Sequence, residues 1–181
     1  MQTRIPFLLC LSLVLAVPAA AQTKKPEPAH PAAAASNAPK EIASFEDWTA
    51  ATHQEGDHTA CYALTRAQNS TPKLPRRGEV VLTVTERPAA RDTVAIEAGF
   101  DYAKDANVTV QVDQTGLDFF TRERDAYARD GKAAVAAFQK GAQAIARSPG
   151  PKGQQVTDTF SLKGFSAAYA AIVKACPPPK G

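Results

Sequence analysis

Short runs in which every second residue is apolar occupy the centre of the chain, and they constrain its fold more than any other feature. Three such runs cover residues 80–85, 94–100 and 108–112, and a fourth begins at Leu117 after the turn at 113–116. Alternation with a period of two places the apolar side chains on one face of a strand, and short connecting turns favour antiparallel hairpins. The sequence therefore predicts a mainly β domain.

Further strands are expected on both sides of these central runs. Two stretches that precede the central runs, residues 44–51 and 59–65, combine β-branched and apolar residues. Residues 154–162, which follow the central runs, do the same. The segment Pro-Gly-Pro-Lys-Gly at 149–153 is typical of a turn, so it should lead into the last strand.

Two helices interrupt the strands. Asp130 can cap a helix that runs to about Lys140, where Gly141 stops it. Residues 165–176 carry apolar side chains at helical spacing along one face, and three prolines end the pattern. We expect an antiparallel β-sandwich or open barrel, with the C-terminal helix packed on it and one further short helix.

The first 21 residues have the form of a secretory signal peptide. Arg4 supplies the positive charge, residues 7–17 form an apolar run too short for a comfortable membrane span, and Ala19–Ala21 offers a cleavage site. No later segment resembles a transmembrane helix. The expected location is therefore the periplasm or the secreted fraction.

A proline- and alanine-rich segment follows at residues 22–40. It has little that could be buried in a core, so we expect a disordered tether. The expected organisation is then a single β-rich domain at residues 41–177, followed by a short tail at 178–181.

Signal cleavage removes Cys10 and leaves Cys61 and Cys176. An exported chain with two cysteines most often joins them, and we expect this disulfide. Closing a loop of roughly a hundred residues is worth about 4–5 kcal/mol in the chain-entropy model. Two free thiols are the alternative.

Charge and motifs exclude several functions. The net charge is +3 and basic residues are mixed with acidic ones, so nucleic-acid binding is not indicated. Neither a phosphate-binding loop nor a dinucleotide-binding glycine motif is present, and we expect no cofactor. The two histidines of residues 53–58 lack metalloprotease spacing, and a solvated loop is the simpler interpretation.

One loop carries a denser positive charge. Lys73, Arg76 and Arg77 fall within five residues of the loop "TPKLPRRGE" at 71–79. A protein partner or an anionic envelope surface could bind these residues, although a solvated loop also explains them.

Ser166 invites a catalytic interpretation. The stretch Gly164–Ala168 is close to the Gly-x-Ser-x-Gly elbow of hydrolases, but its fifth residue is Ala168 and no histidine follows His58. We favour a structural role, in which Ser166 caps the C-terminal helix, and keep a serine hydrolase as an alternative.

Four segments together resemble a known family. They are "FEDWTAA" at 45–51, "CYAL" at 61–64, "RGEVVLTVTERP" at 77–88 and "TDTFSLKGFSAAY" at 157–169. In this order they resemble the invasion-associated locus B family of exported alphaproteobacterial proteins. The resemblance implies a periplasmic or envelope-associated β-rich domain without known catalysis, and the family name refers to host-cell invasion.

The chain departs from that family in its cysteines. Many members have a cysteine near the position of Thr52, and others have a cysteine pair in the later half, which is missing here. The family's disulfide pattern therefore cannot be transferred. The leading hypothesis is a non-enzymatic exported protein that binds an unknown protein or envelope component, with a small-ligand carrier as a further alternative.

Overall fold

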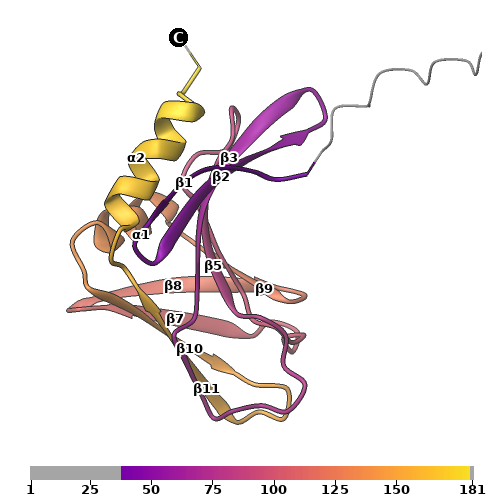
Figure 1. Cartoon of the computed structure of the whole chain (residues 1–181). Helices are drawn as coiled ribbons and strands as arrows, with labels where there is room; N and C mark the ends of the chain where they lie inside the picture. Colours follow the sequence, from indigo (N-terminus) through magenta and orange to yellow (C-terminus); the bar gives the residue numbers. More distant parts are fainter. Residues whose placement is uncertain (1–37, 180–181) are drawn as a thin grey trace, which may run out of the picture. The chain divides into compact units, whose positions relative to one another are not determined.

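The structure, a computed structural model, describes residues 38–179. The predicted signal peptide and residues 22–37 of the predicted tether lie outside this range. The described part contains these elements, shown in Figure 1: β1 (Lys40–Phe45), β2 (Trp48–Glu55), β3 (His58–Arg66), β4 (Asn69–Thr71), β5 (Val81–Glu86), β6 (Thr93–Glu97), β7 (Asn107–Val112), β8 (Thr115–Arg122), β9 (Asp125–Ala128), α1 (Gly131–Phe138), β10 (Gln143–Pro149), β11 (Gln155–Ser161) and α2 (Phe165–Ala175).

All eleven strands belong to one antiparallel sheet in the order β1-β2-β3-β5-β6-β9-β8-β7-β10-β11-β4. Strand β4 follows β3 almost directly along the chain, yet it pairs with β11 at the far end of the sheet. The backbone N–H of Gln68, between β3 and β4, also donates to the carbonyl of Thr159 at 2.8 Å. The sheet therefore curls on itself without forming a closed barrel, and the predicted mainly antiparallel architecture is confirmed as one curled sheet.

The strands expected in the centre of the chain are present, and their inward residues are buried. The first expected strand, residues 44–51, is instead divided between the end of β1 and the start of β2, with the hairpin turn between them. Glu46 has a φ of 50° there, and Phe45 pairs with Trp48 across a tight hairpin. A pattern of alternating residues does not reveal a two-residue reversal within it.

Strands β4, β9 and β10 were not expected from the sequence. In β10 the buried positions are Ala144, Ala146 and Ser148, which are too small or too polar to give a hydrophobic alternation. Strands β4 and β9 contain three and four residues. Such strands form because neighbouring strands offer hydrogen-bond partners, so only the tertiary fold defines them.

Helix α1 starts as predicted, since the carboxylate of Asp130 accepts the Ala133 N–H at 2.9 Å. Helix α2 is also confirmed, but its predicted cap is wrong. The capping residue is Gly164, with a φ of 84°, and a Cβ at this position would overlap the carbonyl oxygen of Phe45. Ser166 instead lies exposed in the first turn, where its Oγ donates to the Gln139 carbonyl at 3.5 Å.

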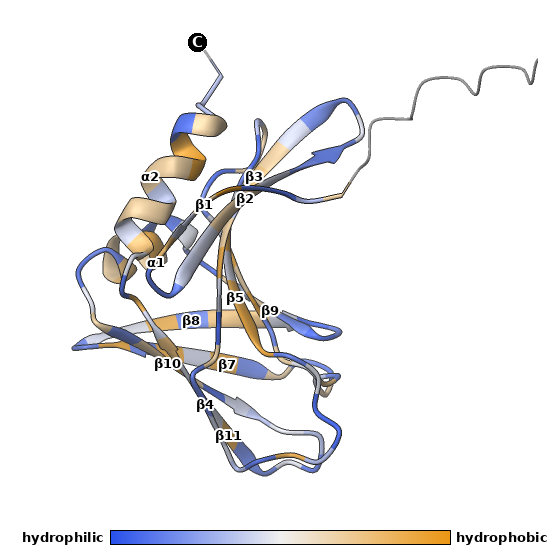
Figure 2. Cartoon of the chain, in the orientation of Figure 1, coloured by the Kyte–Doolittle hydropathy of each residue, from blue (hydrophilic) through white to orange (hydrophobic). Residues whose placement is uncertain are grey.

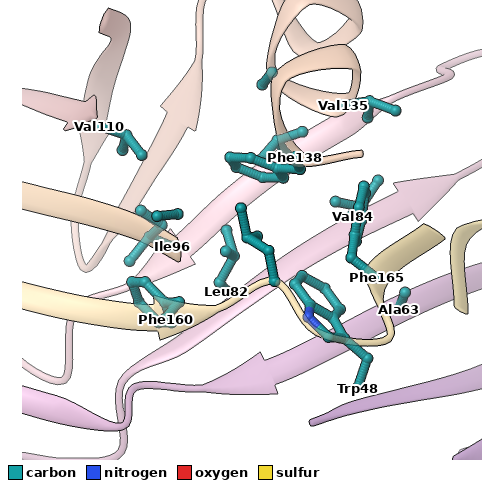
Figure 3. Close-up of a cluster of buried hydrophobic side chains, with 14 of the residues drawn as sticks. Trp48, Ala63, Leu82, Val84, Ile96, Val110, Val135, Phe138, Phe160 and Phe165 are labelled. Carbon is teal, nitrogen blue, oxygen red and sulfur yellow. The ribbon is translucent and has the colours of Figure 1, made fainter. Parts of the chain in front are cut away.

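Aromatic side chains fill the space between the sheet and the two helices, as Figure 3 shows. The rings of Trp48 and Phe165 lie 4.8 Å apart, and those of Phe138 and Phe165 lie 5.6 Å apart. The indole N–H of Trp48 donates to the Ser161 carbonyl at 3.0 Å, so its one polar group is satisfied. Full burial of each such side chain contributes about 1.5–3 kcal/mol, and α2 is therefore an integral part of the core.

The hydropathy of the residues differs between the hairpin turns and helix α2 (Figure 2). Hydrophilic residues gather in the hairpin turns, whereas α2 is mostly hydrophobic along its length. Its buried residues are Phe165, Ala168 and Ile172, which lie on one helical face. Within residues 38–179, neither helix has the length and hydrophobicity needed to cross a membrane.

Candidate functional site

The predicted disulfide is present. Cys61 in β3 and Cys176 at the end of α2 are bonded, with their Cα atoms 5.9 Å apart. Cys61 is fully buried and Cys176 nearly so. The bond ties the end of the fold to an early strand.

The basic loop has only two exposed cations. Lys73 and Arg76 are exposed, but the Arg77 side chain is 7% exposed and forms an ion pair with Asp158. Both terminal nitrogens of Arg77 donate to this carboxylate at 2.8 Å, and its Nε donates to the Ala98 carbonyl at 2.7 Å. The expectation that Arg77 belongs to a solvated loop or partner surface is wrong, because burial against a matched carboxylate recruits it into the structure.

The histidine segment is a hairpin tip, not a separate loop. His53 lies near the end of β2, which ends at Glu55, and His58 begins β3. Glu55 accepts hydrogen bonds from Arg87 at 2.7 and 2.8 Å and one from His53 at 2.8 Å, and these bonds, with Arg87 the largest cause, lower the pKa of Glu55 to about 2. Within residues 38–179, no group of three or more side chains is arranged to hold a metal ion.

A polar cluster beneath α2 was missed by the sequence analysis. Glu86 is fully buried and forms an ion pair with Arg91. Asp92 accepts a hydrogen bond from the Tyr169 hydroxyl at 2.6 Å. A signal did exist in the sequence, because Glu86 continues the inward-facing series of Leu82 and Val84.

The outer face of the sheet carries a continuous row of side chains. The register aligns Thr83 of β5 with Ala95 of β6, Ala95 with Tyr127 of β9, and Tyr127 with Phe120 of β8. A hollow of about 220 Å³ lies over β5, β6 and β9 and is lined by Thr83, Ala95 and Tyr127, among others.

Phe120 extends this row beyond the hollow. It is 40% exposed and, with Ile42, one of two large hydrophobic side chains exposed within residues 38–179. Its ring stacks on Tyr127 with centroids 5.6 Å apart, and the Arg129 guanidinium lies 5.7 Å from the Phe120 centroid. We call Phe120, Tyr127 and Arg129 the aromatic patch. No alternating pattern in the sequence distinguishes it from ordinary outward-facing strand residues.

A larger hollow of about 380 Å³ lies near the ends of β7, β10 and β11. The side chains of Gln68, Gln111, Gln143 and Lys163 line it. These long amide and amine side chains can adopt many conformations, and the lining of this hollow contains no aromatic side chain that would restrict them. The aromatic patch is the better candidate for a binding surface.

Comparison with known proteins agrees with the fold. The family model described as invasion associated locus B (IalB) protein matches residues 48–173. The crystal structure of invasion associated protein B from Bartonella henselae superposes with a TM-score of 0.55 at 17% sequence identity, covering 74% of this chain and 96% of that one. No curated protein matches the chain.

Proposed function

Because the chain belongs to the invasion associated locus B family, we propose that it is an exported, non-enzymatic protein that binds a protein partner through the outer face of its sheet. The Cys61–Cys176 disulfide supports export, since such bonds persist in oxidising compartments such as the periplasm. The similarity to the Bartonella protein supports the fold alone and carries no partner to this chain.

The exposed ring of Phe120 is the observation that carries the proposal. Aromatic residues and arginine are enriched at the centres of protein interfaces, where they supply much of the binding energy. The Phe120 ring stacks on Tyr127 of the neighbouring strand, which restricts its rotation, and Arg129 adds a cation at its side. A rigid anchor loses little conformational entropy when a partner covers it.

The surrounding charges favour a protein over an anionic membrane surface. Asp118 and Arg122 are exposed on the same strand as Phe120, so this region carries both signs of charge. A surface of a single positive sign would suit acidic lipid or polysaccharide better. Mixed charge around an aromatic centre is typical of the polar rim of a protein interface.

Substitution of Phe120 tests the proposal, with Ile42 as a matched control. Both side chains are 40% exposed on strands, at different places on the sheet. Phe120→Ala should abolish cross-linking and co-purification of a specific envelope protein with the mature chain, whereas Ile42→Ala should retain it. Capture that is equal for both variants and the wild type would place the interface elsewhere.

Lys73 and Arg76 form the second candidate surface, for an anionic envelope component. Their double charge reversal should leave the protein partner bound if the aromatic patch is the interface. If it instead abolishes capture of the protein partner, and Phe120→Ala does not, the proposed surface is wrong.

Ser166 separates the proposal from the hydrolase alternative. Its Oγ donates weakly to a backbone carbonyl, which does not activate a hydroxyl as a nucleophile. We expect no labelling of the native protein by a serine-reactive probe. Labelling that disappears in Ser166→Ala would contradict the non-enzymatic proposal.

A small-ligand carrier would need interior space that Phe119 and Phe160, both fully buried, help to fill.

A further inference from the structure

The polar cluster beneath α2 holds this helix at two points. The Tyr169 hydroxyl in the middle of α2 donates to an Asp92 carboxylate oxygen at 2.6 Å. The Arg91 Nη1 donates to the carbonyl of Cys176, at the end of the helix, at 2.7 Å. Arg91 and Asp92 are neighbours in the connection between β5 and β6, so this connection clamps the helix.

Glu86 lies at the base of the clamp. It is fully buried, and its Oε1 accepts the backbone N–H of Asp92 at 3.1 Å. Its Oε2 is paired with Arg91 but has no aligned hydrogen bond. Glu86 also lies opposite Cys61 in the register of β3 and β5, so the two side chains share the face of the sheet that carries the disulfide to α2.

The charges of this cluster do not balance. The Asp92 carboxylate, which is half-buried, lies close to that of Glu86, and the one guanidinium of the cluster, that of Arg91, is paired with Glu86. An unbalanced negative charge in a buried site is costly, and one proton on a carboxylate removes the imbalance. Glu86 is the carboxylate that is both fully buried and incompletely hydrogen-bonded, so it is the group where the proton is best placed.

We propose that Glu86, Arg91, Asp92 and Tyr169 form a proton-controlled latch, which holds α2 more firmly in mildly acidic solution than in alkaline solution. The latch acts on local opening of the helix. Complete detachment is prevented by the Cys61–Cys176 bond, which keeps the end of α2 on β3. The inference concerns the fold itself and does not depend on the proposed binding function.

The direction of the effect follows from the environment of Glu86. Burial, as the main cause, raises the pKa of Glu86 from 4.5 to about 7 in the folded protein. Opening of α2 would return the carboxyl to water and to its ordinary pKa. Between these two values the closed state binds a proton that the open state releases, so rising pH favours opening.

Other ionisable groups around the latch do not reverse this direction. Burial raises the pKa of Tyr169 on α2, so its hydroxyl stays protonated. Lys174 in the last turn of α2 is exposed, and Asp130 at the start of α1 is exposed and caps its own helix. Cys61, the neighbour on β3, is in the disulfide.

Amide hydrogen exchange of the oxidised mature chain tests the latch. After correction for intrinsic exchange rates, the opening constant of residues 165–175 should rise by up to about 70-fold between about pH 5 and about pH 8, if Glu86 returns fully to water. Glu86→Gln carries a neutral side chain of the same shape, so its α2 protection should be independent of pH. Glu79→Gln, at an exposed glutamate, should behave like the wild type.

Two outcomes would overturn the proposal. One is equal protection of α2 at both pH values in the wild type, and the other is a pH dependence that persists in Glu86→Gln. If Glu86→Gln does not fold, a carboxyl titration of Glu86 followed by NMR in the wild type decides the matter. A midpoint near that of an ordinary glutamate would contradict the latch, and a midpoint near neutrality that moves together with the α2 amide signals would support it.

Discussion

Two ion pairs in this protein, one buried on both sides and one with a buried carboxylate and a half-buried arginine, differ in how completely they are matched. Arg77 and Asp158 lie 81 residues apart, and each nitrogen of the Arg77 side chain has an acceptor. Glu86 and Arg91 are close in sequence, yet one oxygen of Glu86 lacks an aligned hydrogen bond and a second carboxylate, that of Asp92, lies close to Glu86. In a buried pair with matched charge and complete hydrogen bonding, the carboxylate stays ionised. In an unmatched pair, the carboxylate can take up a proton.

The difference follows from what each pair does in the fold. Arg77 joins the connection before β5 to β11 and so adds to the pairing of β4, in the same connection, with β11. Its guanidinium also lies 5.0 Å from the Phe100 ring centroid. Glu86 and Arg91 lie beneath a helix that the disulfide already secures. The Arg77–Asp158 pair therefore stabilises the fold. In the proposed latch, the protonation of Glu86 changes how firmly α2 is held.

Removal of one partner of the matched pair should have the largest effect. Asp158→Ala leaves the Arg77 charge buried without a partner, and we expect a loss of about 3–5 kcal/mol in the free energy of unfolding. Denaturant titration of the oxidised protein measures it. Replacing both residues by apolar ones of similar volume should cost clearly less, and equal losses would show that the charge imbalance is not the cause.

Loss of the disulfide should come next. Cys176→Ser leaves α2 held by its apolar face and by the cluster around Glu86, so we expect a loss of about 2–5 kcal/mol. Hydrogen exchange should increase first in α2, since a terminal helix frays easily. A thiol titration of the unfolded, unreduced wild type should find no free thiol, and two free thiols per chain would refute the bond.

The pH dependence of stability distinguishes the two ion pairs directly. Because the pKa of Glu86 is about 7 when folded and 4.5 otherwise, its contribution is fully present below pH 4.5 and is lost as pH rises through 7. The loss amounts to at most about 3 kcal/mol. Glu86→Gln should remove this slope, and the apolar double replacement of Arg77 and Asp158 should retain it. A slope that survives in Glu86→Gln would assign the titration to another group.

An exposed ion pair provides the smallest expected effect and the reference for the others. Arg66 and Glu79 interact at 3.0 Å, but their side chains are 63% and 68% exposed. Arg66→Gln should change the unfolding free energy by less than about 1 kcal/mol, because solvent screens such pairs. A loss as large as that of Asp158→Ala would show that burial is not what separates the ion pairs.

The sequence determined those features that neighbouring residues control. Alternating apolar residues predicted β5 to β8, the helical stripe predicted α2, and Asp130 predicted the start of α1, because strand and helix periodicity and helix capping act within a few residues. The disulfide was also predictable, since only two cysteines remain outside the expected signal peptide.

Only the tertiary structure decided which distant segments meet. It paired β4 with β11, turned Arg77 inward to Asp158, and placed Glu86 beneath α2. It also set Phe120 beside Tyr127 on the outer face. A residue's burial and its charge partners depend on contacts between segments that are far apart in sequence. The local sequence pattern does not predict those contacts.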